Sequence, residues 1–470
     1  MGHPNYYSLP PWQGPTDLHA SFSWEWFGPT GTRYEDSFIA AVIDDKRNIY
    51  VNGHNHVYKL DQNGVLQWTY TIPSYTSGDA VILYDGKVYG ATGDGQFFAV
   101  DMESGIQRWV NKVTDAVGGQ HCQLAAHKGV VVTKGEHGKA GCGKMGCAQG
   151  KVFGLNSTDG AHLWTYDPGE TLWDVFPQFP DDESVIIMDQ SGAVSRVKLQ
   201  SGELIWKAGG IPGAWTDGSQ FVASNDLTYT VMIDDTKCFP GVIGCGGWVT
   251  ALKTSDGSTV YSVEVSKPPN CSPVVGRLAE GGKLTMIMPI GQQTGSCDPP
   301  AGWIYAKLGD LGMPEFIKAG SFVFFHTLTV WLGKDHHWLL WGKRDRTHDL
   351  VAFDAETGQP LWTWIGPRDT YSMSPGDADG FIPRMMKGIR TVACPTPWSQ
   401  PRIGPDGTIY IGNENGYFFA IRDANHDGRI DDATEVSSYN LKATHGHQGS
   451  AHAPGMMVST TFDGVHVWKF

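Results

Sequence analysis

The chain has 470 residues and a formal net charge of −14, with 18 Trp, 17 Tyr, 20 Phe and 60 Gly. The acidic balance, without a basic run, argues against nucleic acid or an anionic membrane as the main partner. No apolar run of about 18 residues is present, so no transmembrane segment is expected. Many aromatic residues and glycines together are typical of short strands joined by tight turns.

In chain order, residues 21–27 (SFSWEWF) form one short strand without a partner nearby in sequence. Units of four short strands follow, and the first four units end near residue 208. In the sixth unit we expect strands at 272–277, 283–288, 303–308 and 315–319, and in the seventh at 325–331, 337–342, 350–355 and 360–364. An eighth unit ends near residue 441, and residues 453–470 give two more strands.

A repeat of four short strands at this spacing predicts an all-β propeller of four-stranded antiparallel blades. Such a sheet has two apolar faces, and stacking the blades around an axis buries both. We expect the N-terminal strand to close the ring by joining the C-terminal strands. This count gives nine units, but rings of seven or eight blades are the common cases, so we predict eight. One unit, the sixth or the tail, would then be an accessory strand pair, and residues 1–470 form a single domain.

A turn motif carries a family resemblance. Ala99-x-Asp101-x3-Gly105-x3-Trp109 recurs as Ala352-x-Asp354-x3-Gly358-x3-Trp362, and looser copies end at Trp164, Trp206, Tyr261 and Phe316. These repeats resemble the tryptophan-docking motif of quinoprotein dehydrogenase propellers, the PQQ-like repeat family. They also resemble the bacterial lipoprotein propeller that helps to assemble outer-membrane proteins and binds no quinone. We expect each Trp to bridge two blades by packing.

The segment 423–435 predicts a calcium site. Its oxygen-bearing residues stand at positions 1, 3, 5 and 9 of a loop with Gly428 at position 6, which resembles an EF-hand-type loop. Position 12 is Thr434, and Glu435 comes one place late. The expected ligands are Asp423, Asn425, Asp427, the Arg429 carbonyl, Asp431 and Glu435, and the expected role of the ion is to stabilise the loop.

The eight cysteines favour an extracellular or otherwise extracytoplasmic location, although the first residues do not have the apolar core of a signal peptide. Two close pairs, Cys142/Cys147 and Cys238/Cys245, lie in Gly-rich insertions, and Cys271 with Cys297 is a plausible disulfide. Cys122 and Cys394 are left over. Zinc is the rival interpretation, but the sequence has no CxxC pair.

In a four-stranded blade, the start of the innermost strand and the turn between strands two and three lie on one face. This scheme collects the cysteines there, together with His121, Asp174, Asp217, His326, His447 and His452. Candidate catalytic residues are His121, Asp174, His326, His447 and His452, as transition-metal ligands or general bases. The alternative is a wet channel lined by polar side chains. The connection 367–390 crosses the same face and is a candidate lid.

Resemblance to the quinoprotein dehydrogenases implies a quinone cofactor, two adjacent cysteines beside it and a calcium-bound Glu, Asn and Asp set. The sequence has no Cys-Cys pair and no recognisable set of this kind, so a quinone is not expected. We predict a calcium-stabilised propeller that binds a protein or small molecule at the channel mouth, through the Cys/His-rich face. The alternatives are an enzyme with a His-based metal site in the funnel, a lyase or hydrolase, and a quinone-dependent dehydrogenase.

Overall fold

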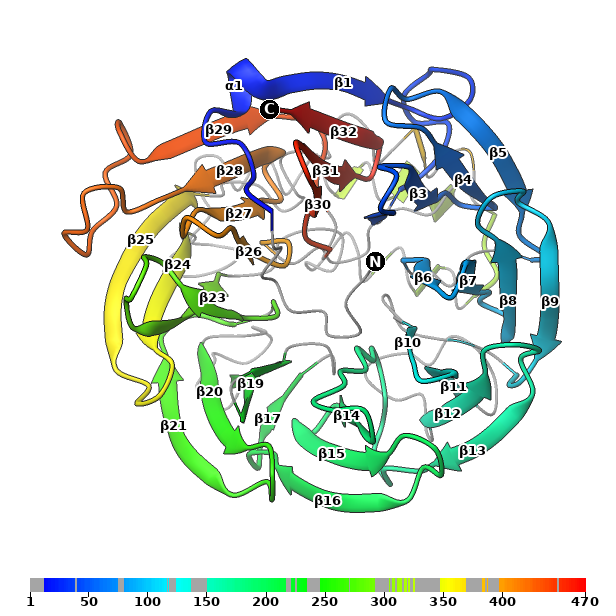
Figure 1. The fold of residues 1–470 in the computed structure, drawn as a ribbon, viewed down its shortest axis with the longest axis horizontal. Coiled ribbons are helices and arrows are strands. Elements are labelled where there is room, and N and C mark those ends of the chain that lie inside the picture. The colour runs from blue at the N-terminus through cyan, green and yellow to red at the C-terminus, as the bar shows by residue number, and fades with distance from the viewer. Residues whose placement is uncertain are drawn as a thin grey trace.

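The computed structural model forms a ring of sheets around a central axis (Figure 1). It describes residues 12–38, 40–74, 80–115, 117, 124–136, 150–216, 221–224, 226–234, 246–269, 271–291, 347–368, 397–445 and 448–470. In the two long connections it also describes residues 304, 307–308, 311–314, 317–318, 320–321, 324–325, 383–384 and 387.

Eight antiparallel blades make up the ring, so the predicted count is confirmed. The first three blades have four strands each, in sequence order from the axis outwards. Blade 1 contains β2 (Ala41–Ile43), β3 (Ile49–Asn52), β4 (His56–Leu60) and β5 (Leu66–Thr71). Blade 2 contains β6 (Ile82–Tyr84), β7 (Lys87–Ala91), β8 (Gln96–Asp101) and β9 (Gln107–Lys112). Blade 3 contains β10 (Ala125–His127), β11 (Val130–Glu136), β12 (Gly150–Asn156) and β13 (His162–Tyr166).

The next two blades depart from four strands. Blade 4 contains β14 (Ser184–Met188), β15 (Ala193–Lys198) and β16 (Leu204–Gly209), and a bridge from Gln178 to Ile186 stands where an innermost strand is expected. Blade 5 contains β17 (Ala214–Trp215), β18 (Phe221–Ser224), β19 (Leu227–Asp234), β20 (Gly246–Lys253) and β21 (Thr259–Val265), with both β17 and β18 paired to β19.

The last three blades return to four strands. Blade 6 contains β22 (Val274–Arg277), β23 (Leu284–Ile290), β24 (Thr347–Asp354) and β25 (Pro360–Arg368). Blade 7 contains β26 (Arg402–Ile403), β27 (Ile409–Gly412), β28 (Tyr417–Ile421) and β29 (Val436–Asn440). Blade 8 contains β30 (Ala451–Ala453), β31 (Met456–Thr461), β32 (Gly464–Lys469) and β1 (Phe22–Trp26), which follows the short helix α1 (Leu18–Ser21).

The N-terminal strand closes the ring as predicted. β1 pairs antiparallel with β32, from Phe22 opposite Trp468 to Trp26 opposite Val465 (Figure 1). Strands from the two ends of the chain therefore share one blade, and the circle of packed sheets is complete.

The predicted sixth and seventh units are wrong, because they are one blade. β22, β23, β24 and β25 form one sheet in that order, with β23 paired to β24, and residues 291–346 connect these two strands. Among the described residues of the expected strand at 303–308, Ile304, Lys307 and Leu308 are helical. Phe316 falls within this connection and lies outside the described residues.

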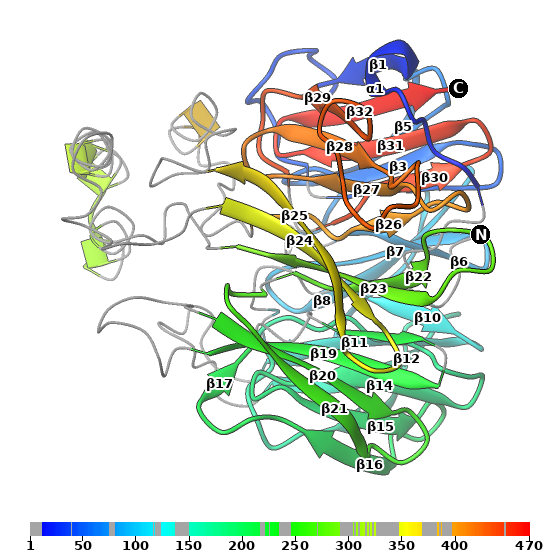
Figure 2. The same cartoon turned by 90° about the vertical axis from the view of Figure 1, so that its left-hand side faces the viewer.

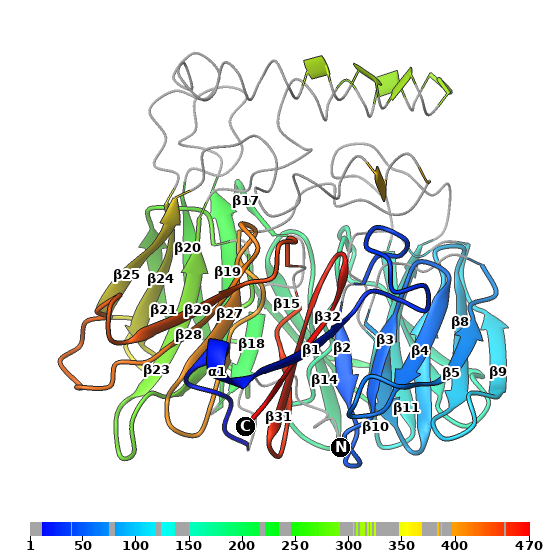
Figure 3. The same ribbon diagram turned by 90° about the horizontal axis from the view of Figure 1, so that it is seen from above.

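Long connections leave the ring at one end, which we call the insertion face. It is the end at which the second strand of each blade turns into the third, as at Glu136, Asp234 and Ile290. Described helical residues between 304 and 325 stand off the ring on this side (Figures 2 and 3). The turns that carry the repeated motif join the third strand to the fourth and lie at the opposite end.

Tryptophans on the outermost strands bridge neighbouring blades, as predicted. Five of them donate the indole N–H to the backbone carbonyl of the residue after the Asp position of the next blade's turn. The bonds are Trp24 to Gln62 (3.3 Å), Trp68 to Met102 (3.1 Å), Trp109 to Ser157 (3.3 Å), Trp164 to Leu199 (2.7 Å) and Trp206 to Thr254 (3.1 Å), and the Tyr261 hydroxyl reaches Ala355 (3.0 Å). One geometry thus serves six of the eight interfaces.

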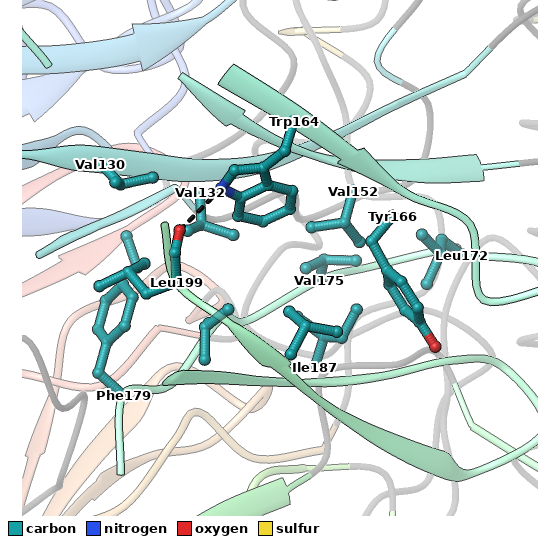
Figure 4. Close-up of a cluster of buried hydrophobic side chains, with 13 residues drawn as sticks. Val130, Val132, Val152, Trp164, Tyr166, Leu172, Val175, Phe179, Ile187 and Leu199 are labelled. Carbon is teal, nitrogen blue, oxygen red and sulfur yellow. Dashed lines mark hydrogen bonds between the residues drawn. The ribbon is translucent and has the colours of Figure 1, made fainter. Parts of the chain in front are cut away.

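Trp164 shows why the turn needs glycine. Its ring packs among valines and leucines of blades 3 and 4 (Figure 4), and only 5% of the residue is exposed. A Cβ on Gly202 would lie 2.6 Å from the indole ring, and the residue has φ +68. Both the close approach and the left-handed backbone favour glycine.

Replacing Trp164 with Phe removes the indole donor and leaves the Leu199 carbonyl unpaired in the core. We expect the free energy of unfolding to fall by about 1–3 kcal/mol, measured by denaturant titration. The control is Leu163→Ala on the same strand, where the side chain is 43% exposed, with an expected change within about 0.5 kcal/mol. Equal losses in the two variants would contradict the docking role.

Candidate functional site

The insertion face is the region in which the sequence placed the candidate residues. Connections 137–149, 235–245 and 291–346 join second to third strands there, and 369–401 leads to β26 from the same end. His121, Asp217, His326, His447 and all cysteines except Cys271 lie outside the described residues. Their predicted roles stay predictions.

Asp174 and His452 are described, and they lie on opposite sides of the ring. Asp174 is 1% exposed and precedes the bridge residue Gln178 of blade 4. His452 stands in β30 of blade 8, beside the turn to β31 and thus near the end away from the insertion face. The structure therefore does not bring these two candidates together (Figure 1).

His452 is held as a neutral side chain. Its Nε2 contacts Ser450 Oγ at 2.9 Å, and its ring packs on Tyr410 with centroids 5.0 Å apart. Burial lowers the pKa of His452 to about 3, and the nearby Arg402 charge acts in the same direction. The ring is therefore uncharged near neutral pH.

Cys271 does not form the predicted disulfide with Cys297. It is a free, buried thiol, 3% exposed. Its Sγ donates to the Ser399 carbonyl at 3.2 Å, so the side chain points toward blade 7. Burial raises the pKa of this thiol, which keeps it protonated and unreactive.

Three buried pairs of ionisable side chains lie near the insertion face. His348 and Glu414 are 3.3 Å apart with side chains 1% and 0% exposed. Lys267 pairs with Asp349, and Arg384 pairs with Asp463. Each carboxylate has a cationic or ionisable partner from another part of the chain, which is the arrangement that makes buried charge tolerable.

The predicted lid is fastened at the residues that the structure describes. Arg384 is fully buried, its guanidinium bonds Asp463 beyond the end of β31, and it also lies over the Phe462 ring at 5.9 Å. Lys387 pairs with Glu35. This part of the connection 369–401 is therefore anchored to blade 8 and to the segment before blade 1.

The sequence did not single out two buried histidines, His348 and His466. His466 is fully buried in β32, bonds Thr461 Oγ1 at 3.0 Å and lies 3.6 Å from Glu25. No local pattern marks both as buried, since His466 lies between Val465 and Val467 but His348 lies between Thr347 and Asp349. The carboxylate partner of each is distant in sequence and could not be inferred.

The acidic loop 422–435 is shaped by its own backbone amides. Asp423 accepts from the amides of Asp427 (3.2 Å) and Gly428 (3.0 Å). Glu435 accepts from the amides of Ala424 (2.8 Å), Asn425 (3.2 Å) and Asp431 (2.9 Å). These amides lower the pKa of Glu435. The bonds of its carboxylate to them close the loop from the C-terminal end.

This loop takes the place of the docking turn between blades 6 and 7. Trp364 Nε1 donates to Asp432 Oδ1 at 2.6 Å, and Ile430 packs in the same apolar cluster as Trp362. The loop projects from the rim of the ring between β28 and β29 (Figure 1). A cavity of about 570 Å³ lies beside it, lined by Asp17, His19, Arg422 and Glu435 among other residues.

No three His, Cys, Asp or Glu side chains among the described residues are grouped so that they could hold a metal ion. In the acidic loop, the carboxylates are instead engaged with backbone amides.

Comparison with known proteins identifies the architecture. The family model described as outer membrane protein assembly factor BamB matches residues 26–170. The matched residues span blades 1 to 3, and the eight-bladed ring has the fold of the PQQ-like propellers. Its recognised repeats extend beyond the matched residues, as the docking bonds of blades 4 to 6 show. A comparison with curated protein sequences gives no significant match.

Solved propellers of two kinds share the fold. BamB from Moraxella catarrhalis is 15% identical, with 93% of this chain and 99% of that chain covered and a TM-score of 0.55. A europium-containing methanol dehydrogenase is 11% identical, and the match covers 100% of this chain and 99% of that chain with a TM-score of 0.61. Quinohemoprotein alcohol dehydrogenase from Comamonas testosteroni is 11% identical, and the match covers 97% of this chain and 78% of that chain with a TM-score of 0.56. At these identities the likeness shows the fold alone.

Within the described part of this propeller, no helix is both long and apolar enough to cross a bilayer.

Two buried histidines of blades 7 and 8 predict a pH dependence of stability. Burial lowers the pKa of both His445 and His452 to about 3. The unfolded chain takes up these protons below about pH 6.5 and the folded chain does not. Stability is therefore fully present above that pH and falls as the pH drops, by about 1.4 kcal/mol per unit for each histidine.

We expect His445→Gln to reduce the loss of unfolding free energy between pH 7 and 5.5, measured by urea titration at both values. His19→Gln, at an exposed position, serves as the control and should keep the parent difference. An unchanged pH dependence in His445→Gln would show that this residue does not contribute to it.

Proposed function

We propose that this propeller is a binding or scaffolding protein that acts in an extracytoplasmic compartment and meets its partner at the insertion face. The observation that carries the proposal is the gathering of the long connections at one end of the ring. The opposite end carries mostly short motif turns, whose task is to pack blades together. Loops added to one end of a rigid scaffold are the usual carriers of recognition.

The buried charges near this face support binding over catalysis. A catalytic carboxylate or histidine needs an environment that leaves it available to the substrate. Here Glu414, Asp349 and Asp463 each have an internal partner and almost no exposure. In the described residues, the pair of Glu414 with His348 links blades 6 and 7, and the pair of Asp463 with Arg384 fixes a long connection to blade 8.

We propose that no quinone acts here. The sequence has no adjacent cysteine pair, and among the described residues Asp349, Glu414 and Asp463 near the insertion face are paired within the chain. The BamB-described family match and the BamB neighbour agree with an assembly or binding role and with an extracytoplasmic location.

A photocrosslinking residue at Lys387, on the insertion face, tests the proposal in the native host. We expect one discrete adduct with another macromolecule from this position. The matched control is Glu103, exposed on a motif turn at the opposite end, and should give none. Adducts of equal yield from both positions would remove the insertion face as the recognition surface.

Metal analysis of the purified protein distinguishes the proposed binding role from the alternative, an enzyme with a His-based metal site. A stoichiometric transition metal that survives dialysis, with no adduct at Lys387, would favour catalysis in the funnel through His121, His326 and His447. A preparation without that metal, with the adduct, supports the binding role.

We further propose that calcium stabilises the acidic loop. Asp423, Asn425, Asp427 and Asp431 supply side-chain oxygens and Arg429 its carbonyl, while Glu435 closes the loop. Hard oxygen ligands at this spacing suit calcium. Because Asp432 and Ile430 contact blade 6, an ion here would strengthen the interface between blades 6 and 7.

Saturating calcium should raise the free energy of unfolding by about 2–3 kcal/mol at a hundredfold excess over Kd, measured by denaturant titration with calcium or with EDTA. Asp427→Ala should abolish the difference. The control is Asp256→Ala, which removes an exposed carboxylate from the corresponding turn of blade 5. It should leave the calcium effect on the free energy of unfolding unchanged. A calcium effect that survives in Asp427→Ala would place the ion elsewhere.

A further inference from the structure

We propose that Asn156 is a site of N-linked glycosylation, so that the protein carries an oligosaccharide at the end of the ring opposite the insertion face. The modification rests on the extracytoplasmic location in the proposed function, because such oligosaccharides are found on surface loops of secreted proteins. It goes beyond that function, since neither recognition at the insertion face nor blade packing requires it.

The acceptor motif lies on an exposed turn. Asn156, Ser157 and Thr158 form the triplet Asn-x-Ser/Thr, with no proline in the middle. Asn156 is the last residue of β12, and the triplet continues into the motif turn of blade 3. Thr158 and Asp159 are exposed on this turn. A transferase and a bulky oligosaccharide therefore have room at this position.

The turn uses the side-chain oxygen of Asn156 but not its amide nitrogen. Oδ1 accepts from the Thr158 amide at 2.8 Å. The main-chain groups of Asn156 pair with the Ala161 carbonyl and the Gly160 amide, both at 2.8 Å. In the part of the chain that the structure describes, Nδ2 has no hydrogen-bond partner, and it is not closed off from solvent. The atom that would carry the sugar is thus free, while the rest of the residue is held.

Other blades show that the fold does not need an asparagine here. Asp61, Asp101 and Asp354 occupy the same position in blades 1, 2 and 6, and each accepts from the amide two residues on, at 2.8–3.1 Å. An aspartate therefore makes the same bond as Asn156 Oδ1. The nitrogen is the one group that the asparagine adds, and blade packing makes no use of it.

In blades 2 and 6 the second side-chain atom at this position has a cationic partner. Asp101 Oδ2 lies 2.6 Å from Arg108, and Asp354 Oδ2 lies 3.1 Å from Lys283. In blade 3 the residue that corresponds to Arg108 is Leu163, which is 43% exposed. The side chain at that position therefore makes no polar contact that would compete with attachment of a sugar to Nδ2.

The co-reactant is an oligosaccharide linked to a lipid pyrophosphate. A bond forms between Asn156 Nδ2 and the anomeric carbon of the first sugar. The bond from that carbon to the pyrophosphate oxygen breaks, lipid pyrophosphate leaves, and the amide nitrogen loses one proton to a basic group of the transferase. No oxidant or reductant takes part. The product adds a polar, bulky group to the motif end of the ring and leaves the insertion face uncovered.

Mass spectrometry of the chain purified from its native host tests the proposal. We expect the peptide that contains Asn156 to be heavier by the mass of an oligosaccharide. An amidase that releases N-linked glycans in heavy-oxygen water should leave a labelled aspartate at this position. Asn156→Asp, which keeps the turn bond, and Thr158→Val, which keeps the asparagine, should each lose the modification completely. The Asn156→Asp variant should unfold at the same denaturant concentration as the enzymatically deglycosylated parent.

Cell fractionation separates this proposal from the proposed function. An unmodified Asn156 peptide from protein outside the cytoplasm would overturn the glycosylation alone. Unmodified protein in the cytoplasmic fraction would overturn both the glycosylation and the proposed location. A glycan that persists in Asn156→Asp would also contradict the assignment, because the sugar would then be attached elsewhere, for example at the second triplet, Asn270-Cys-Ser.

Discussion

The ring depends on one hydrogen bond, made repeatedly between neighbouring blades. An indole or phenol on the outermost strand donates to a backbone carbonyl in the next blade's turn, at 2.7–3.3 Å in the six cases. The carbonyl would otherwise be a buried acceptor without a partner. Because Trp24 comes from the N-terminal strand and reaches Gln62 of blade 1, the same bond also seals the circle.

The acidic loop is the place where this rule changes. Blade 7 has no short docking turn, and the 14 residues between Ile421 and Val436 stand there instead. The donor shifts to Trp364 and the acceptor becomes the Asp432 side chain. A carboxylate on a long loop is easier to displace than a backbone carbonyl in a tight turn. This interface is therefore the one at which an ion that orders the loop has the greatest effect on the ring.

Local patterns were sufficient to predict most of the blades, but they did not predict that the expected sixth and seventh units form a single blade. The 99–109 repeat specifies strand, turn and docking residue within a few positions, and the structure confirms its packing role. Residues 303–308 alternate like a strand, yet the described ones are helical, because β24 already occupies the third position of blade 6. The sequence made a disulfide between Cys271 and Cys297 plausible, but the Cys271 thiol faces blade 7. Such outcomes depend on partners distant in sequence, as does the His348–Glu414 pair.

The two ends of the ring have different physical tasks, and this division is the reason to look for function at only one of them. Motif turns are constrained by the indole that lies against their glycine, so they tolerate little change. Connections on the insertion face are under no such constraint, and blade 6 tolerates one that runs from Gly291 to Arg346. The ring fixes these connections through buried pairs such as Arg384 with Asp463. A rigid circle with long connections anchored on one face is an arrangement that suits the recognition role proposed above.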